Sequence, residues 1–109
     1  MIRDLKAADY LDHAYGPGVN IVVLYRQDDL GLYRDALTQL DLIEHHLHGS
    51  PHIHLWRCSI ETPEDAEAVQ VVKLPQVRFF LRGSERFSHV GVMDADVLLN
   101  RIFVIEESR

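Results

Sequence analysis

Thiol chemistry in this sequence depends on one residue, Cys58, because the 109 residues contain a single cysteine. One thiol can neither form a disulfide within the chain nor complete a dithiol cycle, which needs an attacking and a resolving cysteine. Cys58 lies in the run HIHLWRCSI (52–60), whose aromatic and β-branched residues indicate a central strand. Reactive cysteines are exposed and lie beside cations, and only Arg57 adjoins this one. We therefore expect Cys58 to be buried and to act as a small apolar residue.

Histidines are the second candidate for chemistry, since five of the seven fall in the run EHHLHGSPHIH (44–54). His45 and His48 are three apart at a predicted helix end, and His52 and His54 share one face of a predicted strand. Imidazoles at these spacings can bind zinc, copper or nickel, so a metal-handling role for the cluster is one alternative. The spacing matches no closed zinc motif, and histidine also complements the dipole at a helix C-terminus. We predict no metal site.

Composition and motifs limit the remaining function classes. The sequence contains no nucleophile elbow, phosphate-binding loop or Ser-His-Asp order, so we predict no catalytic residue and no cofactor. A net charge of −6 disfavours binding to nucleic acid. No apolar run approaches the ~20 residues that span a bilayer, and acids near the N-terminus disfavour a secretory signal. These features predict one cytoplasmic domain, residues 1–109, without a nucleic-acid or membrane partner.

Hydrophobic periodicity predicts strands and helices that alternate along most of the chain. Apolar and alternating runs predict strands at 2–5, 19–25, 52–60, 77–81 and 86–90. Apolar residues at helical spacing predict helices at 7–14, 32–47, 63–71 and 94–105. Thr62 is the expected N-cap of the third helix, with Pro63 at its first position. Because β-α-β units cross over right-handedly and the last two strands suit a hairpin, this order predicts an α/β fold, with a mixed central sheet and helices on both faces.

Several motifs in these elements carry a resemblance to a known family. A strand in VNIVVLYRQDDLGLYR (19–34) leads through an acidic turn into a helix. Leu74-Pro75 precedes the strand VRFFL, Gly83 follows Pro75 by eight positions, and Gly91 follows Gly83 by eight more. Together with the order of elements, these residues resemble the thioredoxin-like superfamily over nearly the whole chain. The resemblance implies a three-layer sandwich with a cis peptide bond before Pro75.

The redox groups of that superfamily are missing from the matching positions. Leu30-Gly31-Leu32-Tyr33 replaces the Cys-x-x-Cys motif, and Leu24 stands where the family keeps a buried acid. The chain therefore resembles a redox-inactive member and is similar to the cysteine-free thioredoxin-like chaperones of hydrogenase maturation. A small-molecule enzyme of this fold, in the glutathione-using branch or elsewhere, is a second alternative, because Tyr33 lies close to the usual thiol-activating position.

Binding of a protein or peptide is the function that the resemblance implies. In thioredoxin-like proteins, the backbone before the proline pairs with an extended substrate chain. An apolar Leu30 in place of a cysteine suits binding more than catalysis. The implied partner-binding patch consists of Leu30, Gly31, Tyr33, Ile60, Leu74, Pro75, Val90, Gly91 and Val92. We expect a non-catalytic protein-binding module, such as an adaptor, chaperone or assembly factor, and not an enzyme.

The missing thiols give a first prediction. We expect the chain to reduce a model disulfide protein no faster than its Cys58→Ser variant, since neither variant holds a thiol pair. The measurement is the rate of disulfide reduction in the presence of a small dithiol. A wild-type rate well above that of the Cys58→Ser variant would overturn the prediction.

Overall fold

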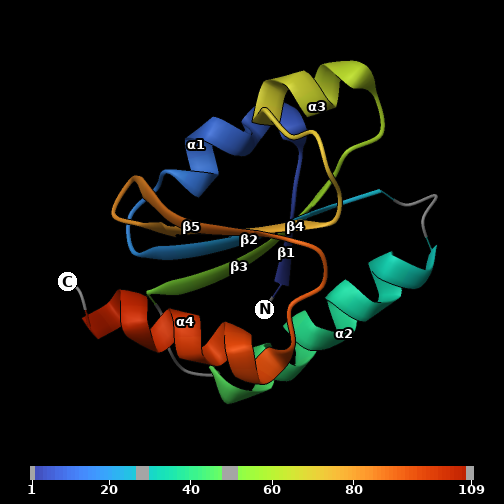
Figure 1. The fold of residues 1–109 in the computed structure, drawn as a ribbon. Coiled ribbons are helices and arrows are strands. Elements are labelled where there is room, and N and C mark those ends of the chain that lie inside the picture. Colours follow the sequence, from blue (N-terminus) through green and yellow to red (C-terminus); the bar gives the residue numbers. More distant parts are fainter. Residues whose placement is uncertain (1, 27–29, 48–51, 108–109) are drawn as a thin grey trace.

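The computed structural model describes residues 2–26, 30–47 and 52–107, which form three layers (Figure 1). The strands are β1 (Ile2–Leu5), β2 (Val19–Tyr25), β3 (Ile53–Ser59), β4 (Gln76–Leu81) and β5 (Ser84–Val90). A 3-10 turn (Ala7–Asp9) precedes the helices α1 (Tyr10–Ala14), α2 (Leu30–His46), α3 (Pro63–Val69) and α4 (Ala95–Glu107). Helices α1 and α3 cover one face of the sheet and α2 and α4 the other.

The middle layer is a five-stranded mixed sheet in the order β1-β3-β2-β4-β5. Strand β3 is parallel to both β1 and β2, whereas β4 is antiparallel to β2 and β5. All seven residues of β2 are buried, as expected for a central strand covered on both faces. The predicted α/β fold, with a mixed sheet between two helical layers, is confirmed. No helix in the described residues is long and apolar enough to cross a membrane.

Alternating side chains along β4 divide the core into two clusters. Phe79 points into the lower cluster, between the sheet and helices α2 and α4, together with Leu40 and Ile102. Phe80 points into the upper cluster, between the sheet and helices α1 and α3, where its ring meets that of Tyr10 edge to face. Each strand residue therefore belongs to one helical layer, and a change on β4 affects the layer that its side chain faces.

Several element boundaries differ by one or two residues from the predictions made on sequence, and two differences have a clear local cause. The first predicted helix (7–14) is a 3-10 turn followed by α1, because the backbone at Asp9 leaves the helical region (φ −101°, ψ 3°). Strand β5 begins at Ser84 rather than at residue 86. Arg82 and Gly83 both have positive φ, which allows a two-residue turn that matches the twist of a hairpin. The two residues that follow the turn therefore join the sheet, with a bulge beside Phe79 and Phe80 on β4.

Helix α3 has the predicted start and a well-defined end. The Thr62 side chain accepts a hydrogen bond from the Asp65 backbone N–H (3.1 Å), and the Asp65 carboxylate accepts one from the Thr62 N–H (3.3 Å). This capping box satisfies donors that the first helical turn leaves unpaired. Gln70 ends the helix in the left-handed conformation, with φ 53° and ψ 53°. The short helix is thus fixed at both ends, although it has only seven residues.

The capping box gives the second prediction. We expect Thr62→Ala to lower the free energy of unfolding by about 0.5–2 kcal/mol, because the Asp65 backbone N–H loses the hydroxyl oxygen that accepts its hydrogen bond. Thr38→Ala is the matched control, since Thr38 lies within α2 and its hydroxyl donates to the Arg34 carbonyl. Alanine there is the better helix former, so that control is expected to cost nothing. Equal loss of stability in both variants in urea unfolding would contradict the assignment.

Candidate functional site

A pocket of about 410 Å³ lies between the first half of α3 and the segment 70–75, which joins α3 to β4. Apolar side chains form part of its wall and come from Ile60, Ala66, Val71, Val72 and Leu74, while polar groups form a comparable share. Thr62 and Pro63 of the α3 start close one end, and Arg26 and Glu61 add charge at the edge. We name this the α3 pocket; it contains two members of the predicted patch, Ile60 and Leu74.

The loop that carries this pocket's outer wall is anchored to the sheet at its far end. The Leu74–Pro75 peptide bond is cis, which confirms the prediction from sequence. The Pro75 carbonyl accepts a hydrogen bond from the Gly91 N–H at 2.8 Å. Val90, the residue before Gly91, pairs with Gln76 in the β4–β5 ladder. The structure therefore brings Pro75, Val90 and Gly91 together, as predicted.

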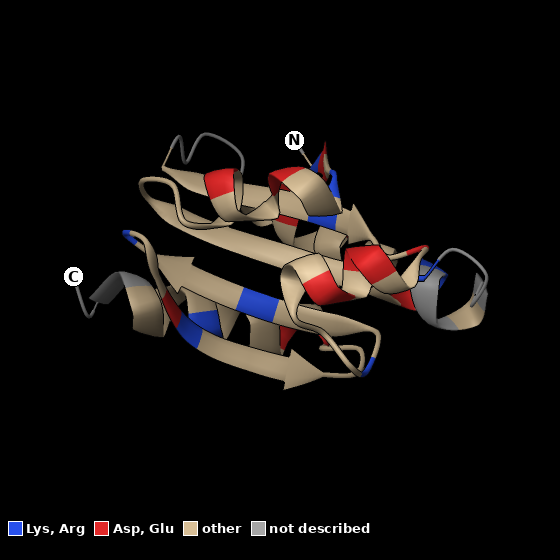
Figure 2. Cartoon of the chain, turned by 90° about the horizontal axis from the view of Figure 1, so that it is seen from above, with Lys and Arg blue, Asp and Glu red and all other residues tan. Residues whose placement is uncertain are grey.

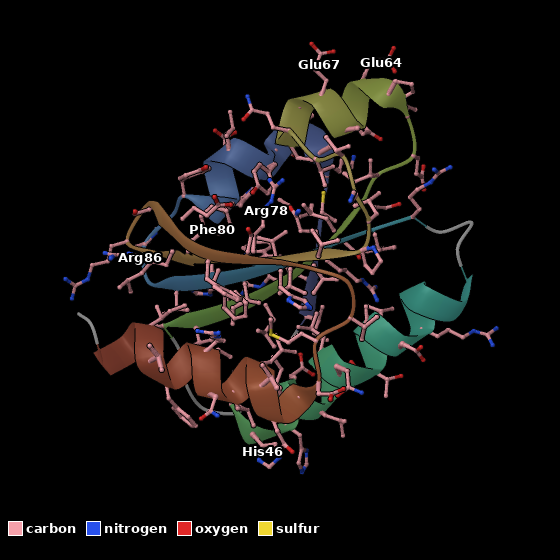
Figure 3. The ribbon with its side chains drawn as sticks, in the orientation of Figure 1. His46, Glu64, Glu67, Arg78, Phe80 and Arg86 are labelled. Atoms are coloured by element: carbon pink, nitrogen blue, oxygen red, sulfur yellow. The ribbon has the colours of Figure 1, made fainter. Side chains whose placement is uncertain are left out.

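The near end of the same loop is held by Arg78 of β4. Its Nη1 donates to the Val69 carbonyl at 2.6 Å, and its Nη2 donates to the Gln70 carbonyl at 2.9 Å. Figure 3 shows the Arg78 side chain directed from the sheet toward the layer of α1 and α3. These carbonyls end α3, where a helix dipole favours a cation. The segment 70–75 is thus fixed between an arginine at one end and the Gly91 backbone at the other.

Two groups on this loop are available to a partner. The Val72 side chain is 96% exposed, which makes it the most exposed large apolar side chain among the described residues. No described residue hydrogen-bonds to the backbone N–H or C=O of Leu74, although its side chain packs against the upper cluster. An apolar side chain and an unpaired peptide group thus lie two residues apart, next to the α3 pocket.

The other residues of the predicted patch have different surroundings. Gly31 lies in the first turn of α2, and a Cβ added there would meet nothing within 4 Å. The side chains of Leu30 and Tyr33 lie outside the described part of the structure. Val92 is half-buried and packs against the lower cluster. A substitution at Val92 would therefore disturb packing as well as any partner, which makes Val72 the better position for a test.

The surface around the α3 pocket is acidic on its helical side. Glu64 and Asp65 lie in the first turn of α3, and Glu67 follows one position after Ala66. Glu64 and Glu67 point away from the chain in Figure 3. In Figure 2, which views the layer of α1 and α3 from above, acidic residues mark both helices. A polyanion would meet like charge on this face.

The histidine cluster is only partly described. His45 is exposed near the end of α2, and His52 and His54 are half-buried at the start of β3, while His48 lies outside the described residues. His46, the last residue of α2, points away from the chain in Figure 3. Burial, followed by the charges of Arg3 and His52, lowers the pKa of the His54 imidazole below its usual 6.5. Within residues 2–26, 30–47 and 52–107, no group of three or more potential ligands is positioned for a metal ion.

Cys58 is fully buried in the upper cluster, as predicted. Burial, with a smaller contribution from the Asp65 carboxylate, raises the pKa of its thiol from 9.0 to about 12. The Arg78 cation opposes this shift without cancelling it. At neutral pH the group is a thiol without access to solvent, so it is neither a nucleophile nor a metal ligand.

The sequence did not single out Val71 and Val72 as site residues. Their signal is nonetheless present in the run VVKLP (71–75), in which apolar residues continue beyond the end of a helix and into a loop. Ala66 was also missed, because an alanine inside an amphipathic helix is not distinctive. Arg78 is the clearest missed residue, since it is a lone charge within the apolar strand VRFFL (77–81).

Comparison with known proteins identifies the fold. No family model matches the chain, and no curated protein sequence is significantly similar to it. The solved structure of thioredoxin from Malassezia sympodialis (Mala s 13) superposes with a TM-score of 0.74 at 15% identity, covering 94% of this chain and 91% of that one. Chloroplastic thioredoxin z superposes with a TM-score of 0.80 at 13% identity, covering 97% and 95%. The chain therefore has a thioredoxin-like fold.

The surroundings of Cys58 give the third prediction. We expect its thiol in the folded chain to react with a colour-forming disulfide reagent at pH 8 at least ~100-fold more slowly than in urea, because the thiolate is scarce and buried. The measurement is the rate of colour release with and without denaturant, and free cysteine is the control for the effect of urea on the reagent. Comparable rates in the folded and unfolded chain would contradict the burial of this residue.

Proposed function

We propose that this chain is a non-catalytic protein-binding module that holds an extended peptide segment at the α3 pocket. The observation that carries the proposal is that the exposed Val72 side chain and the Leu74 backbone, which has no hydrogen-bond partner among the described residues, lie beside a pocket that is partly lined by apolar side chains. An adaptor, chaperone or assembly factor would use such a site. The module acts in the cytoplasm and requires no cofactor.

The apolar contribution to binding would come from a single anchor side chain of the partner. A pocket of about 410 Å³ is within the size range of sites that enclose one ligand group. Ile60, Val71 and Leu74 supply walls, and Val72 would cover the anchor from the open side. Covering Val72 removes apolar surface from water, which is the main favourable contribution to association.

The directional contribution would come from the Leu74 backbone. An extended peptide beside the loop can exchange main-chain hydrogen bonds with this N–H and C=O, which have no partner among the described residues, as in the addition of a strand to a sheet. The loop is held at both ends by Arg78 and Gly91, so little conformational entropy is lost when a partner binds. A rigid loop with free hydrogen-bonding groups supports recognition of a peptide backbone.

Two further observations support a protein partner and a role without electron transfer. The only cysteine of the chain is buried and has a raised pKa, which is unsuited to thiol exchange. The acidic outer face of α3 disfavours a nucleic-acid partner. The structure of chloroplastic thioredoxin z, which has the same fold, is described as defining a type-specific target recognition. A protein with this fold therefore serves in target recognition.

Substitution of Val72 gives the fourth prediction. Short random peptides displayed on phage are selected on the immobilised wild-type chain, and the dissociation constants of the best binders are measured. We expect Val72→Asp to weaken these peptides by about 10-fold or more, which corresponds to about 1.4 kcal/mol, because a charge replaces the apolar cover of the anchor. The melting temperature should stay unchanged, since Val72 is 96% exposed.

Val97→Asp is the matched control for this experiment. Val97 is 46% exposed on α4, in the layer on the opposite face of the sheet. The same charge is therefore introduced far from the α3 pocket, and peptide binding should not change. Selected peptides that bind Val72→Asp as tightly as wild type would refute the proposal, as would a selection that yields no saturable binder.

A further inference from the structure

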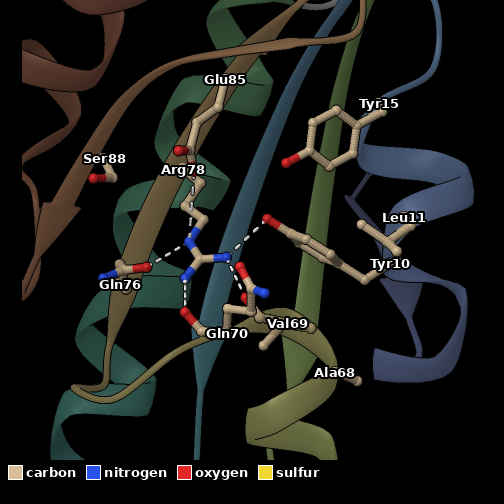
Figure 4. Close-up of a pocket in the computed structure, with 10 residues that line it drawn as sticks. All are labelled: Tyr10, Leu11, Tyr15, Ala68, Val69, Gln70, Gln76, Arg78, Glu85 and Ser88. Carbon is tan, nitrogen blue, oxygen red and sulfur yellow. Dashed lines mark hydrogen bonds and ion pairs between the residues drawn. The ribbon is translucent and has the colours of Figure 1, made fainter.

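The sheet ends in an open edge at β5. Within the described part of the chain, β4 is the only strand that pairs with β5, and it does so along one side. Every residue of β5 is exposed except Phe87 and His89, which are half-buried. Figure 4 shows the Ser88 hydroxyl directed away from Arg78, its neighbour on β4. The outer backbone groups of such an edge can pair with another strand.

The features that protect a sheet edge are confined to one end of β5. The bulge in its pairing with β4 lies next to Glu85, and the Glu85 carboxylate is directed back to Arg78, with 3.8 Å between Oε1 and Nε (Figure 4). From Phe87 to Val90 the pairing with β4 is regular, and this segment contains no proline, lysine or acid. Bulges, prolines and charges are the means by which proteins keep other strands from an open edge. Residues 87–90 can therefore accept a strand.

Helix α4 adds apolar surface to the same side of the molecule, because it runs below β4 and β5 (Figure 1, Figure 2). The guanidinium carbon of Arg101 lies 4.3 Å from the centre of the Phe87 ring, so this side of α4 is turned toward β5. Val97 and Val104 lie four positions before and three after Arg101, which places them on the same side of the helix. Their side chains are 46% and 57% exposed. We name residues 87–90 with Val97, Arg101 and Val104 the β5 side face.

A two-fold axis through this face would bring matching groups of two copies together. Neighbouring strands lie ~4.8 Å apart, so two α4 helices below the outer strands of a joined sheet would lie ~10 Å apart, which is a helix-packing distance. An axis beside Phe87 and Ser88 passes close to Arg101, which contacts Phe87. Because antiparallel order reverses the second copy, Val97 of each copy then faces Val104 of the other.

The charges near the β5 side face favour antiparallel contact between two copies. Among the described residues, β5 and this side of α4 carry one acid, Glu85, and two cations, Arg86 and Arg101, whereas the whole chain has a net charge of −6. Antiparallel pairing sets Glu85 and Arg86 against the uncharged end of β5 at Val90. Parallel pairing would set each charge against its own copy, which is destabilising. The acidic helices α1 and α3 lie on the other face of the sheet, outside this contact (Figure 2).

We propose that the chain forms a two-fold symmetric dimer through the β5 side face, in which two β5 strands pair antiparallel and the two five-stranded sheets become continuous. Val97 and Val104 of the two copies pack together below the joined strands. One strand edge and one side of a helix form a small interface, so we expect a dissociation constant on the order of 10–100 µM. The α3 pocket stays accessible, because it lies in the opposite helical layer.

Sedimentation velocity over a series of concentrations tests the dimer. We expect a shift from monomer to dimer as the concentration rises from ~5 to ~500 µM. Salt should strengthen the association, since it screens the repulsion between two chains of net charge −6 and between the two Arg101 side chains near the axis. Amide hydrogen exchange gives a second measurement. Amides of residues 87–90 that face outward should become protected only at high concentration, whereas those bonded to β4 should be protected throughout.

Charge variants test the antiparallel contact. Val97→Lys and Val104→Asp should each weaken association by about 10-fold or more, because a charge is buried against an apolar side chain. An equimolar mixture of these two variants should regain association, since the new cation of one faces the new carboxylate of the other. Leu42→Asp is the matched control. Leu42 is 50% exposed on α2, which contacts β1 at the opposite edge of the sheet, so association should not change.

Three results would refute the proposal. One is a wild-type chain that remains monomeric at the highest concentration. Another is an equal effect of Val104→Asp and Leu42→Asp on association. The last is a mixture of the Val97 and Val104 variants that associates no better than either variant alone. Far-UV circular dichroism at ~5 µM, where the wild type is a monomer, confirms that each variant is folded, and the melting temperatures there should be unchanged because all three positions are exposed.

Discussion

The buried guanidinium of Arg78 joins three parts of the molecule that are distant in the sequence. It extends from β4, contacts the Tyr10 hydroxyl on α1 and holds the last carbonyls of α3. Removing such a cation from water costs on the order of several kcal/mol, so it persists only because these oxygens replace the lost hydration. Conversely, the carbonyls of Val69 and Gln70 depend on Arg78, since a short helix cannot satisfy its own C-terminal groups. The upper layer is therefore attached to the sheet by a polar contact as well as by its apolar cluster.

The position of the α3 pocket follows from this attachment. Because Arg78 fixes the end of α3, the segment 70–75 starts from a defined position, and the hydrogen bond between Gly91 and Pro75 fixes where it ends. Val72 is left exposed between these anchors and forms part of the α3 pocket.

Much of the fold was predictable because its signals are local. A continuous apolar run predicted the buried strand β2, and Thr62-Pro63 predicted the start of α3, since both depend on neighbouring residues alone. The start of β5 was not predicted, because the polar Ser84 and the charged Glu85 are typical of a turn. Only the positive φ of Arg82 and Gly83 shows that the turn is complete before Ser84. Local composition therefore located the hairpin but not its register.

The site was less predictable, for a physical reason that Arg78 illustrates. Its hydrogen-bond partner Tyr10 lies 68 positions away in the sequence. The role of a charged residue within an apolar strand depends on such distant partners, which the neighbouring residues do not reveal. The resemblance to thioredoxin-like proteins placed Ile60 and Leu74 in one patch because it carried a complete three-dimensional arrangement, which periodicity does not. The resemblance could not predict Val72 as a site residue. The exposure of Val72 depends on where α3 ends in this chain and on the path of the loop that follows. Site residues whose position is shared by proteins of this fold can thus be predicted from the sequence. Residues that adapt the fold to one ligand can be identified only from the contacts in the three-dimensional structure.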